Sequence, residues 1–358
     1  MSGKLEQAAL FDPNAFGRPL PLVGEQKDIR YFGTIARSVL NGTETTGMGF
    51  WSINPYVGCA FGCAYCYARY AHRYVAERLS TADGAGDAVR EELGALPSWL
   101  AFERRIFVKR EAGAVLRREL KRPARMRALL RETVVIGTAT DPYQPAERRY
   151  RITRGVLETL AEQRGLSVTI ITKSPLVTRD VDVLMHIASV SRLSVHVSLI
   201  TTDRELARRL EPRAPTPEAR LRAIARLREH GIEVGVNVMP VLPGITDAPH
   251  LLESLVRSVA AANASYLGAC ALRLQSTARQ RYLPFIEKEF PHLAARYRST
   301  YARSHQVGER YRQGLRAHFQ ALCATHGVTY DRYYKKEDDA DDPGEPEPVE
   351  SEQLTLAL

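Results

Sequence analysis

Short apolar runs alternate with amphipathic stretches along most of the chain. Six runs are rich in β-branched and other apolar residues: Phe50–Asn54, Thr133–Gly137, Ser167–Thr172, Leu193–Leu199, Ile232–Val238 and Tyr266–Leu274. Apolar runs separated by helical patterns are typical of βαβ units, whose strands pair in parallel and are buried on both faces. The pattern therefore predicts six parallel strands, in a doubly wound sheet or a partial barrel. In either architecture the chemistry gathers at the carboxyl ends of the strands.

Helical periodicity fills most of the intervening chain. The expected helices are a short stretch near Ile35–Leu40, then Tyr65–Leu79, two Arg-rich stretches that end at Arg131, Glu147–Gln163, Arg179–Ala188, Asp203–Leu210, Glu218–His230, Ala248–Ala262, Tyr282–Tyr297 and Glu309–Thr325. Arg105–Lys109 is a possible further strand, and the Gly/Ala-rich segment Ala82–Ala88 is expected to be a mobile insertion. The predicted division is an N-terminal extension over 1–48, a core over 49–275 with an insertion at about 81–131, a helical region over 276–336 and an acidic tail over 337–358.

Composition narrows the class of protein. The 358 residues are 44% hydrophobic and 25% charged, which excludes collagen-like, low-complexity and wholly disordered chains. No apolar run reaches the length of a membrane helix and the first residues contain no signal peptide, so we expect a cytoplasmic protein without membrane contact. In that reducing compartment the five cysteines are expected to be ligands, catalysts or buried thiols.

The net charge of +9 conceals an asymmetry. Residues 337–358 contain nine acidic and no basic residues, so the remaining 336 residues hold 50 basic against 32 acidic residues, a formal charge of +18. A body this basic would attract a polyanion such as nucleic acid. The alternative is that the arginines are spread over many solvated helix faces.

Three cysteines follow the first apolar run within eight residues. Cys59, Cys63 and Cys66 have the spacing C-x3-C-x2-C, and Gly58 and Gly62 lie in the same segment. Glycines let the backbone approach inorganic sulfide closely. A closed zinc site or an electron-transfer [4Fe–4S] cluster takes four protein ligands, whereas three thiolates leave one iron open. The alternative is a zinc site with His72 as fourth ligand.

This spacing at the end of the first strand resembles the signature of the radical S-adenosylmethionine (SAM) superfamily. The resemblance covers roughly residues 30–325 and is strongest to the branch related to spore photoproduct lyase, the DNA repair photolyase-like proteins. The other segments that carry it are residues 36–40, 137–147, 172–174, 211–215 and 240–244. It implies an α/β fold, namely a partial (β/α)6 TIM-like barrel with an N-terminal extension and a C-terminal helical cap.

The resemblance also implies the cofactors and the chemistry. Cys59, Cys63 and Cys66 would hold a [4Fe–4S] cluster whose open iron binds SAM. A flavodoxin or ferredoxin would donate the electron that cleaves SAM to a 5′-deoxyadenosyl radical. The radical would then abstract hydrogen from a substrate, for which a nucleic-acid lesion is the candidate, in a lyase or DNA repair reaction. Two rival functions remain: a non-catalytic Fe–S redox sensor and a zinc-bearing nucleic-acid-binding module.

Polar residues that follow the other strands are the candidates for SAM contacts. By the resemblance, Thr138 and Thr140 would meet its amino group, Lys173 its carboxylate and Ser198 its ribose. Tyr65 and Asn237 would lie near the adenine.

Glu211 and Arg213 either contact SAM or brace a rigid loop by pairing with each other. Asp141 and Glu147 are either catalytic or cap the following helix.

Tyr67 is a candidate to line the part of the site that receives the substrate. Spore photoproduct lyases place a hydrogen-donating cysteine just before the polar residue that ends the second strand, and residues 137–140 contain none. Cys270 on the last strand is the candidate to replace it, although a cysteine in an Ala-rich strand is more often plain core. Cys323 is expected to be packing.

Overall fold

The computed structural model describes residues 22–26, 28–34, 36–42, 49–72, 91 and 93–330. Within this part of the chain, one sheet has eight strands and a second has four. The large sheet has the order β12-β11-β10-β9-β8-β7-β4-β3. Its strands are β3 (Leu40–Asn41), β4 (Trp51–Ile53), β7 (Thr133–Ile136), β8 (Ser167–Thr172), β9 (Arg192–Ser198), β10 (Glu233–Val241), β11 (Tyr266–Ala271) and β12 (Thr329–Tyr330).

All six strands expected from the apolar runs are present. From β4 through β7, β8, β9, β10 and β11, each pairs in parallel with the next. β12 adds a short parallel strand at one edge, and β3 an antiparallel one at the other. Because these two edge strands do not pair with each other, the sheet remains open. The predicted α/β partial barrel is thus confirmed, and it is not closed.

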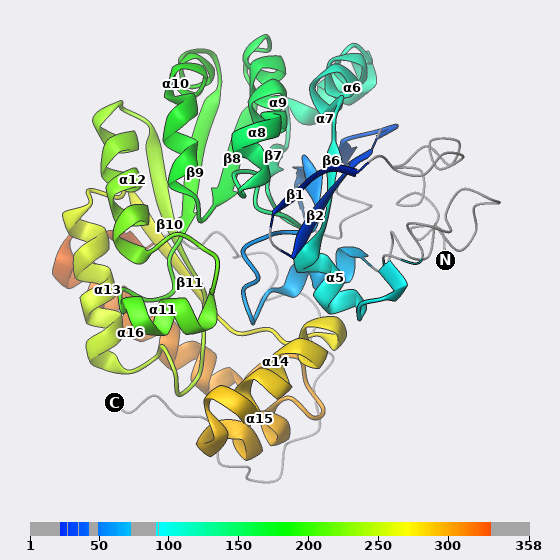
Figure 1. Ribbon diagram of the computed structural model, residues 1–358. Coiled ribbons are helices and arrows are strands. Elements are labelled where there is room, and N and C mark those ends of the chain that lie inside the picture. Colours follow the sequence, from blue (N-terminus) through cyan, green and yellow to red (C-terminus); the bar gives the residue numbers. More distant parts are fainter. Residues whose placement is uncertain are drawn as a thin grey trace.

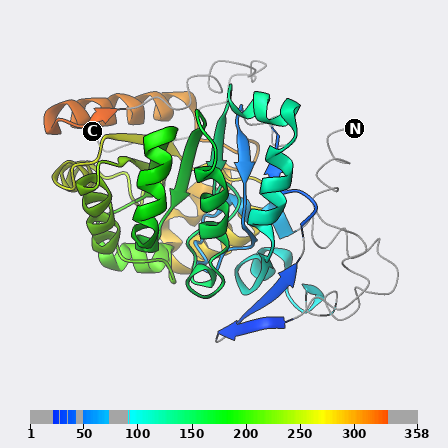
Figure 2. The same cartoon turned by 90° about the horizontal axis from the view of Figure 1, so that it is seen from above.

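Helices connect the parallel strands and cover one face of the sheet (Figures 1 and 2). The first helices of the described chain are η2 (Tyr67–Tyr70), α5 (Ser98–Arg104), α6 (Ala112–Leu120), α7 (Pro123–Leu129), α8 (Ala146–Tyr150), α9 (Ile152–Ala161), η3 (Pro175–Asp180) and α10 (Val181–Val190). The later ones are α11 (Arg204–Leu210), α12 (Pro217–Glu229), α13 (Pro249–Ala261), α14 (Ser276–Glu289), η4 (Pro291–Leu293), α15 (Ala294–Thr300) and α16 (Glu309–His326). α16 packs against β11, β12 and α13.

The two faces of the sheet differ in polarity. The face toward the helices is made of β-branched side chains that are at most 1% exposed: Val134, Ile136, Val168, Ile170, Val195, Val197, Val234, Val236 and Val238. The opposite face, toward the inside of the open barrel, carries Thr169, Ser194, His196, Asn237 and Tyr266. Alternation along each strand therefore separates an apolar core from a polar interior.

A second sheet stands beside the first strand of the barrel. Its order is β1 (Leu22–Gln26), β2 (Ile29–Thr34), β6 (Arg105–Lys109) and β5 (Tyr56–Val57). β6 comes from the stretch expected as an insertion, and it pairs in parallel with β2 from the expected N-terminal extension. β5 leads directly into the segment that carries Cys59, so this small sheet forms one wall next to the cysteine loop.

The helix expected near Ile35–Leu40 is wrong. Ile35 lies outside the described residues, Ala36 forms an isolated bridge, and Leu40 belongs to strand β3. The N–H groups of Val39 and Leu40 donate to the Glu119 carboxylate in α6, at 2.9 and 3.3 Å. A distant carboxylate thus satisfies the backbone groups that a helix would have satisfied locally.

Other helices differ from expectation in extent. Glu147–Gln163 is split into α8 and α9 at Arg151, and Tyr282–Tyr297 is split among α14, η4 and α15 at Pro291. Of Tyr65–Leu79, residues 65–72 are described, and the helix there begins at Tyr67 with η2. The segment Ala82–Ala88 lies outside the described residues. Across the described ranges, no helix combines the length and apolar character needed to span a membrane.

Candidate active site

The three neighbouring cysteines lie on one loop between β5 and η2. Two glycines on this loop have left-handed backbone angles, with φ of 88° at Gly58 and 67° at Gly62. A Cβ on Gly58 would lie 2.7 Å from the Phe102 carbonyl oxygen, and one on Gly62 would lie 2.6 Å from an Arg213 guanidinium nitrogen. Both positions therefore favour glycine for conformation, and Gly58 also requires it for space, because its near neighbour is a backbone oxygen.

The connection after β7 holds the first half of the loop. The Thr140 hydroxyl donates to the Gly58 carbonyl oxygen at 2.5 Å, and the Gln144 amide nitrogen donates to the same oxygen at 3.0 Å. The Gln144 amide oxygen accepts from the Ala60 N–H at 2.9 Å. The Thr140 hydroxyl also accepts a hydrogen bond from the Gln144 amide nitrogen at 3.0 Å. Thr140 and Gln144 therefore hold each other as well as the Gly58 carbonyl oxygen.

Buried charged side chains hold the second half. Arg69, which is 0% exposed, donates to the Cys63 carbonyl oxygen at 2.8 Å and to Glu103 at 2.7 Å. Arg213 donates from Nε to the Ala60 carbonyl oxygen at 2.6 Å and lies 3.7 Å from the Glu103 carboxylate. Backbone bonds add to this, because the Ala64 N–H donates to the Leu210 carbonyl oxygen at 2.9 Å. The loop is thus fixed from several sides before any cofactor binds.

Of the two alternatives for Glu211 and Arg213, pairing with each other does not occur in the structure. Glu211 instead forms a short, fully buried ion pair with Arg220 and also accepts a hydrogen bond from the Tyr65 hydroxyl. Arg213 lies on the other side of the cysteine loop, against Glu103. Pro212 stands between the two residues in the chain, and the two side chains reach different partners from a single rigid turn.

Lys173 lies at the carboxyl end of β8 beside this pair. Its ammonium nitrogen is 5.8 Å from the centre of the Tyr65 ring. Within the described part of the chain, that ammonium makes no ion pair within 4 Å. Burial alone lowers the pKa of Lys173, but the negative charges of Cys63, Glu211 and Asp141 raise it overall. Lys173 is therefore a charged group held next to the cysteines and available to an anionic ligand.

Asp141 and Glu147 make structural contacts. The Asp141 carboxylate accepts from the Thr172 hydroxyl at 2.7 Å and the Lys173 N–H at 2.8 Å, so it joins the ends of β7 and β8. The Glu147 carboxylate accepts from the backbone N–H of Thr153 at 2.9 Å, within the first turn of α9. Glu147 therefore takes the capping role that the sequence offered as an alternative to catalysis, while Asp141 caps no helix.

Thr138 and Tyr67 meet at the mouth of the loop. The Thr138 hydroxyl accepts from the Asn54 amide at 3.1 Å, and its carbonyl oxygen accepts a hydrogen bond from the Tyr67 hydroxyl. The Tyr67 side chain is 49% exposed. These contacts place Tyr67 over the end of β7, next to the cysteines in sequence.

The remaining candidates lie on the interior face of the barrel. Register places Asn237 of β10 beside Ser198 of β9 on one side and Gly268 of β11 on the other. Cys270 follows Gly268 by two residues, so it is on the same face, and it is half-buried. Cys323, in contrast, is buried in α16, as expected for a packing residue.

Comparison with known proteins decides the family. The sequence profile of the Radical SAM superfamily matches residues 53–255, more than half of the chain. The chain belongs to the radical SAM superfamily. Membership supports a SAM-cleaving radical enzyme with a [4Fe–4S] cluster.

Relatives and solved structures agree with this assignment. An uncharacterised protein of Mycobacterium tuberculosis is 34% identical over 305 residues, which cover 85% of this chain and 83% of the relative. One from Methanocaldococcus jannaschii is 25% identical over 217 residues, covering 61% of this chain and 70% of the relative. A structure of spore photoproduct lyase superposes with a TM-score of 0.57 at 14% identity, covering 88% of this chain and 87% of the other. Another, with bound AdoMet and dinucleoside spore photoproduct, gives 0.56 at 13% identity and covers 88% of each chain. At these identities the structures establish the fold alone.

The cysteine loop fits a radical SAM cluster in the chemistry of its donors. Burial raises the pKa of Cys59 to about 12, with further contributions from Asp141 and Cys66. Burial also raises the pKa of Cys63, which Lys173 opposes and Cys59 and Cys66 reinforce. The three thiols are thus close enough to repel one another as thiolates, and iron would replace their protons.

His72 makes contacts other than those the zinc alternative requires. Its Nε2 donates to the Arg105 carbonyl oxygen at 2.8 Å, and burial lowers its pKa to about 4. Within the described ranges, no three His, Cys, Asp or Glu side chains are grouped to share one metal ion. A [4Fe–4S] cluster does not need such a group, because each thiolate binds a different iron.

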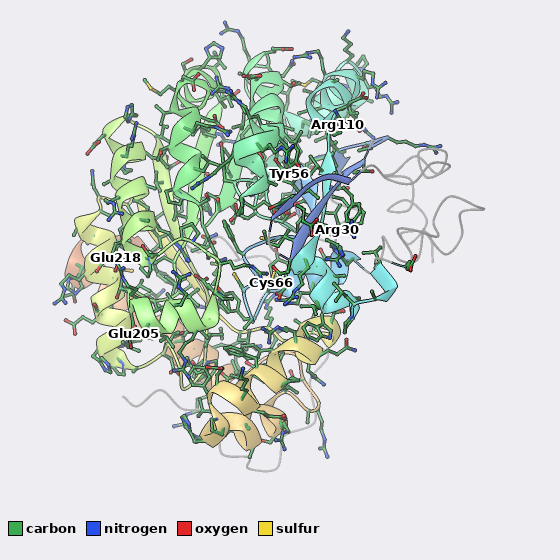
Figure 3. The ribbon with its side chains drawn as sticks, in the orientation of Figure 1. Arg30, Tyr56, Cys66, Arg110, Glu205 and Glu218 are labelled. Carbon is green, nitrogen blue, oxygen red and sulfur yellow. The ribbon has the colours of Figure 1, made fainter. Side chains whose placement is uncertain are left out.

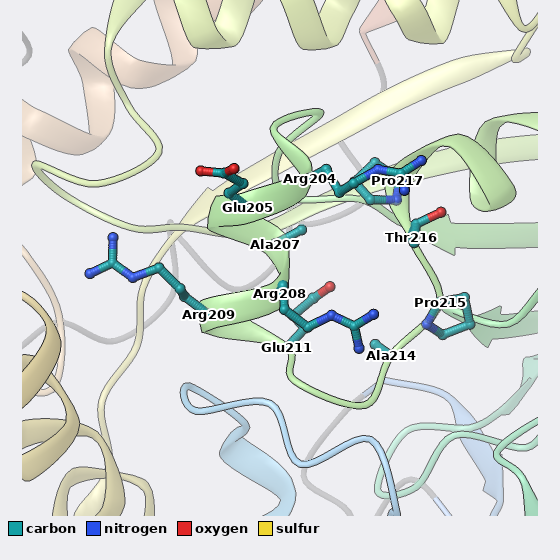
Figure 4. A pocket seen from close by; sticks show the side chains of 10 residues that line it. All are labelled: Arg204, Glu205, Ala207, Arg208, Arg209, Glu211, Ala214, Pro215, Thr216 and Pro217. Atoms are coloured by element: carbon teal, nitrogen blue, oxygen red, sulfur yellow. The ribbon is translucent and has the colours of Figure 1, made fainter.

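A cavity of about 330 Å³ opens behind Glu211 (Figure 4). Its walls are α11 and the turn that leads into α12, with Arg204, Arg208 and Arg209 on the α11 side. Glu211 thus lines this cavity and also accepts a hydrogen bond from Tyr65 of the cysteine loop.

Sequence reasoning missed several residues that position the loop. Arg69, Glu103 and Arg220 were not singled out, because arginine and glutamate are normally exposed and no local pattern marks the buried exceptions. Gln144 lay within a segment that carried the resemblance, and its position four residues after Thr140 was the one available signal.

Proposed function

We propose that Cys59, Cys63 and Cys66 hold the [4Fe–4S] cluster and that SAM binds beside it, across the carboxyl ends of β7 to β10. The observation that carries this proposal is the cysteine loop itself, whose backbone is fixed by Thr140, Gln144 and buried arginines while its thiols stay free of disulfides. When bound, the cluster and SAM supply a one-electron reductive cleavage that starts hydrogen abstraction from a substrate.

Lys173 is the proposed partner of the SAM carboxylate. Its ammonium is charged, lies over the edge of the cysteine site, and makes no ion pair in the described ranges. Ser198, Asn237 and Thr138 are proposed as polar contacts to SAM from the neighbouring strand ends.

Four residues are proposed to hold the cysteine loop and Lys173 in place rather than to contact SAM: Tyr65, Thr140, Glu211 and Arg213. The polar atoms of each already bond to protein partners that hold the cysteine loop or its neighbours. Their contribution would be to keep the loop and Lys173 in place as charge develops in the site.

We propose a nucleic-acid lesion as the substrate, in a DNA repair reaction of the lyase type. The charge of +18 outside the acidic tail supports this class, because binding to polyphosphate scales with such charge. Tyr67 would contact the substrate at the mouth of the loop. Cys270, half-buried on the interior face of β11, would donate the hydrogen atom of its thiol to the product radical, so that a C–H bond forms, the S–H bond breaks and the unpaired electron passes to the Cys270 sulfur.

The proposal also includes the division of the chain into regions, its cellular location and its electron donor. Residues 49–275 would form the catalytic core, with 1–48 as an extension, 276–336 as a helical cap and 337–358 as an acidic tail. A cytoplasmic location and a flavodoxin or ferredoxin as electron donor fit a cluster that needs reducing conditions.

Anaerobic reconstitution tests the proposal. We expect about four iron and four sulfide per chain, and release of 5′-deoxyadenosine from SAM after reduction. Cys63→Ala should abolish both cluster and cleavage, whereas Cys323→Ala, which changes a buried thiol in α16, should leave both intact. A protein with zinc alone, or an intact cluster that never cleaves SAM, would contradict the proposal.

The substrate class has its own test. Deuterated damaged DNA, RNA and small metabolites are each incubated with the reduced enzyme, and deuterium in 5′-deoxyadenosine is measured by mass spectrometry. Transfer from a damaged oligonucleotide supports the proposal, and transfer only from a small metabolite refutes the substrate class. Cys270→Ala should leave the transfer to 5′-deoxyadenosine intact while blocking the return of hydrogen to the product.

A further inference from the structure

Four exposed arginines lie just after β6, in α8 and just after α8. Arg110 directly follows β6, Arg148 and Arg149 are in α8, and Arg151 directly follows α8. Tyr150 lies between them: the Arg149 guanidinium carbon is 5.4 Å from the centre of the Tyr150 ring. The positive charges of Arg149 and Arg110 oppose the rise in the pKa of Tyr150 that burial causes, so both arginines are near its hydroxyl. We call these five residues the arginine face.

The arginines of this face lack acidic partners. In the described ranges, none of the four makes an ion pair, although most neighbouring charges are paired. Arg154, for example, bonds Asp180 at 3.0 Å, and Arg179 bonds Glu147 at 2.8 Å. Arg154 and Arg179 are thus neutralised by carboxylates, whereas the four arginines of the face are not and form a local excess of positive charge.

The acidic residue within α8 does not neutralise this excess. Glu147 is 0% exposed, and its carboxylate bonds Arg179 and the N–H groups that open α9. The exposed acid next in sequence to the face is Glu111, beside Arg110. Among the acids adjacent in sequence, Glu147 is buried and paired and only Glu111 is exposed, so these neighbours do not balance the four guanidinium groups.

The turn that presents the face is strained. Arg151 has φ of 52° and ψ of 34°, a left-handed conformation that non-glycine residues rarely adopt. The Glu147 carboxylate fixes this turn by capping α9 through Thr153 and Arg154. Backbone strain of this kind persists where the surrounding structure imposes it, and it often marks functional sites. The consequence is that Arg148, Arg149 and Arg151 project from a rigid turn.

The face is tied directly to the cysteine loop. Thr140 and Gln144 precede α8 and bond Gly58 and Ala60 of that loop, and the Tyr56 hydroxyl donates to Glu147. Figure 3 shows Arg110, Tyr56 and Cys66 on the side of the molecule where the small sheet stands. The segment that leads into α8 is therefore the same segment that holds the cysteine loop.

We propose that the arginine face binds a single-stranded segment of nucleic acid, with the arginines on its phosphates and the Tyr150–Arg149 pair against a base. This inference rests on the proposed nucleic-acid substrate and deepens it. A basic surface with an aromatic ring and a stacked guanidinium is the chemistry that recognises unpaired nucleotides. An acidic protein partner would use the charges but would not require the ring.

Binding of a fluorescein-labelled, mixed-sequence single-stranded DNA to the holoenzyme tests the inference. Anisotropy is measured anaerobically over a series of salt concentrations. The double variant Arg148→Ala/Arg149→Ala should weaken binding about tenfold at low salt. It should also reduce the slope of log affinity against log salt by about 0.7, because Arg148 loses one phosphate contact on a single strand while Arg149 loses its contact with a base. Tyr150→Ala should weaken binding about 5- to 100-fold, while Tyr150→Phe should keep it.

Controls separate the possible outcomes. Arg222→Ala, an exposed arginine on α12, should bind as the wild type does, and melting temperatures show that the variants are folded. Unchanged affinity and slope in the double variant overturn this inference, while SAM cleavage, assayed separately, still decides the proposed function. The inference is also overturned if the double variant loses binding to an acidic electron carrier but keeps the oligonucleotide. A wild-type protein that binds no oligonucleotide even at low salt overturns the inference and the proposed substrate class, but not the SAM chemistry.

Discussion

The buried pair of Glu211 and Arg220 offers a quantitative test of how the site is held. Both side chains are 1% exposed, and Glu211 also accepts from Tyr65 and faces Lys173. Burial alone raises the pKa of Glu211, but Arg220 and Lys173 lower it overall, so the carboxylate is ionised at neutral pH. Glu211→Gln keeps the shape of the side chain and removes the charge that separates two cations.

We expect Glu211→Gln to lower the free energy of unfolding strongly. Removing one partner of a buried ion pair costs about 3–5 kcal/mol, because the remaining charge stays buried without compensation. The exposed pair of Arg204 and Glu218, at 3.1 Å on neighbouring helices, is the matched control: Glu218→Gln should cost less than about 1 kcal/mol. Replacing both buried partners, with Glu211→Leu and Arg220→Met, should restore much of the lost stability.

Urea unfolding followed by circular dichroism measures these changes in the free energy of unfolding. The affinity for SAM is measured alongside by calorimetry, since Lys173 loses its neighbouring counter-charge in Glu211→Gln and should be displaced. If Glu211→Gln costs no more than Glu218→Gln, the buried pair does not hold this side of the site. The argument would fail equally if the double replacement were less stable than the single one.

Three further outcomes are expected. Gly62→Ala should lower the free energy of unfolding by about 1–3 kcal/mol and reduce the iron content after reconstitution, because φ is 67° and the added Cβ would lie 2.6 Å from Arg213. The control is Gly314→Ala, which has open space around it in α16 and should raise the free energy of unfolding by up to about 1 kcal/mol in the same urea assay. Burial lowers the pKa of His196 from 6.5 to about 4. Between these two pH values the unfolded chain binds the proton more readily than the folded chain, so the free energy of unfolding falls as the pH drops below about 6.5. His196→Gln should remove about 2 kcal/mol of the difference in unfolding free energy between pH 7 and pH 5, and an unaltered difference would refute the assignment. Deleting residues 337–358 removes nine acidic charges and should raise affinity for the labelled oligonucleotide several-fold at low salt, so equal affinity would show that the tail does not compete.

The sequence by itself determined the elements of the barrel and the cysteine triad. The strand over Ser167–Thr172 has the expected bounds, and the other five parallel strands lie within a few residues of theirs. These features are local, because a buried parallel strand is a short apolar run and the spacing of three cysteines is readable in eight residues. Family resemblance also follows from such local motifs.

Only the tertiary structure decided how the site is built around the cysteines. Glu103 is 34 residues from Arg69 in the chain, and Glu211 is 146 residues from Tyr65. No periodicity connects partners so far apart, and a charged residue on a helix is normally read as exposed. The same reason explains why Glu211 pairs with Arg220 rather than with nearby Arg213. It also explains the wrong helix near Ile35–Leu40, where the distant Glu119 accepts the backbone hydrogen bonds. Local pattern sets which segments form strands and helices, but the pairing of buried charges depends on which distant segments the completed fold brings into contact.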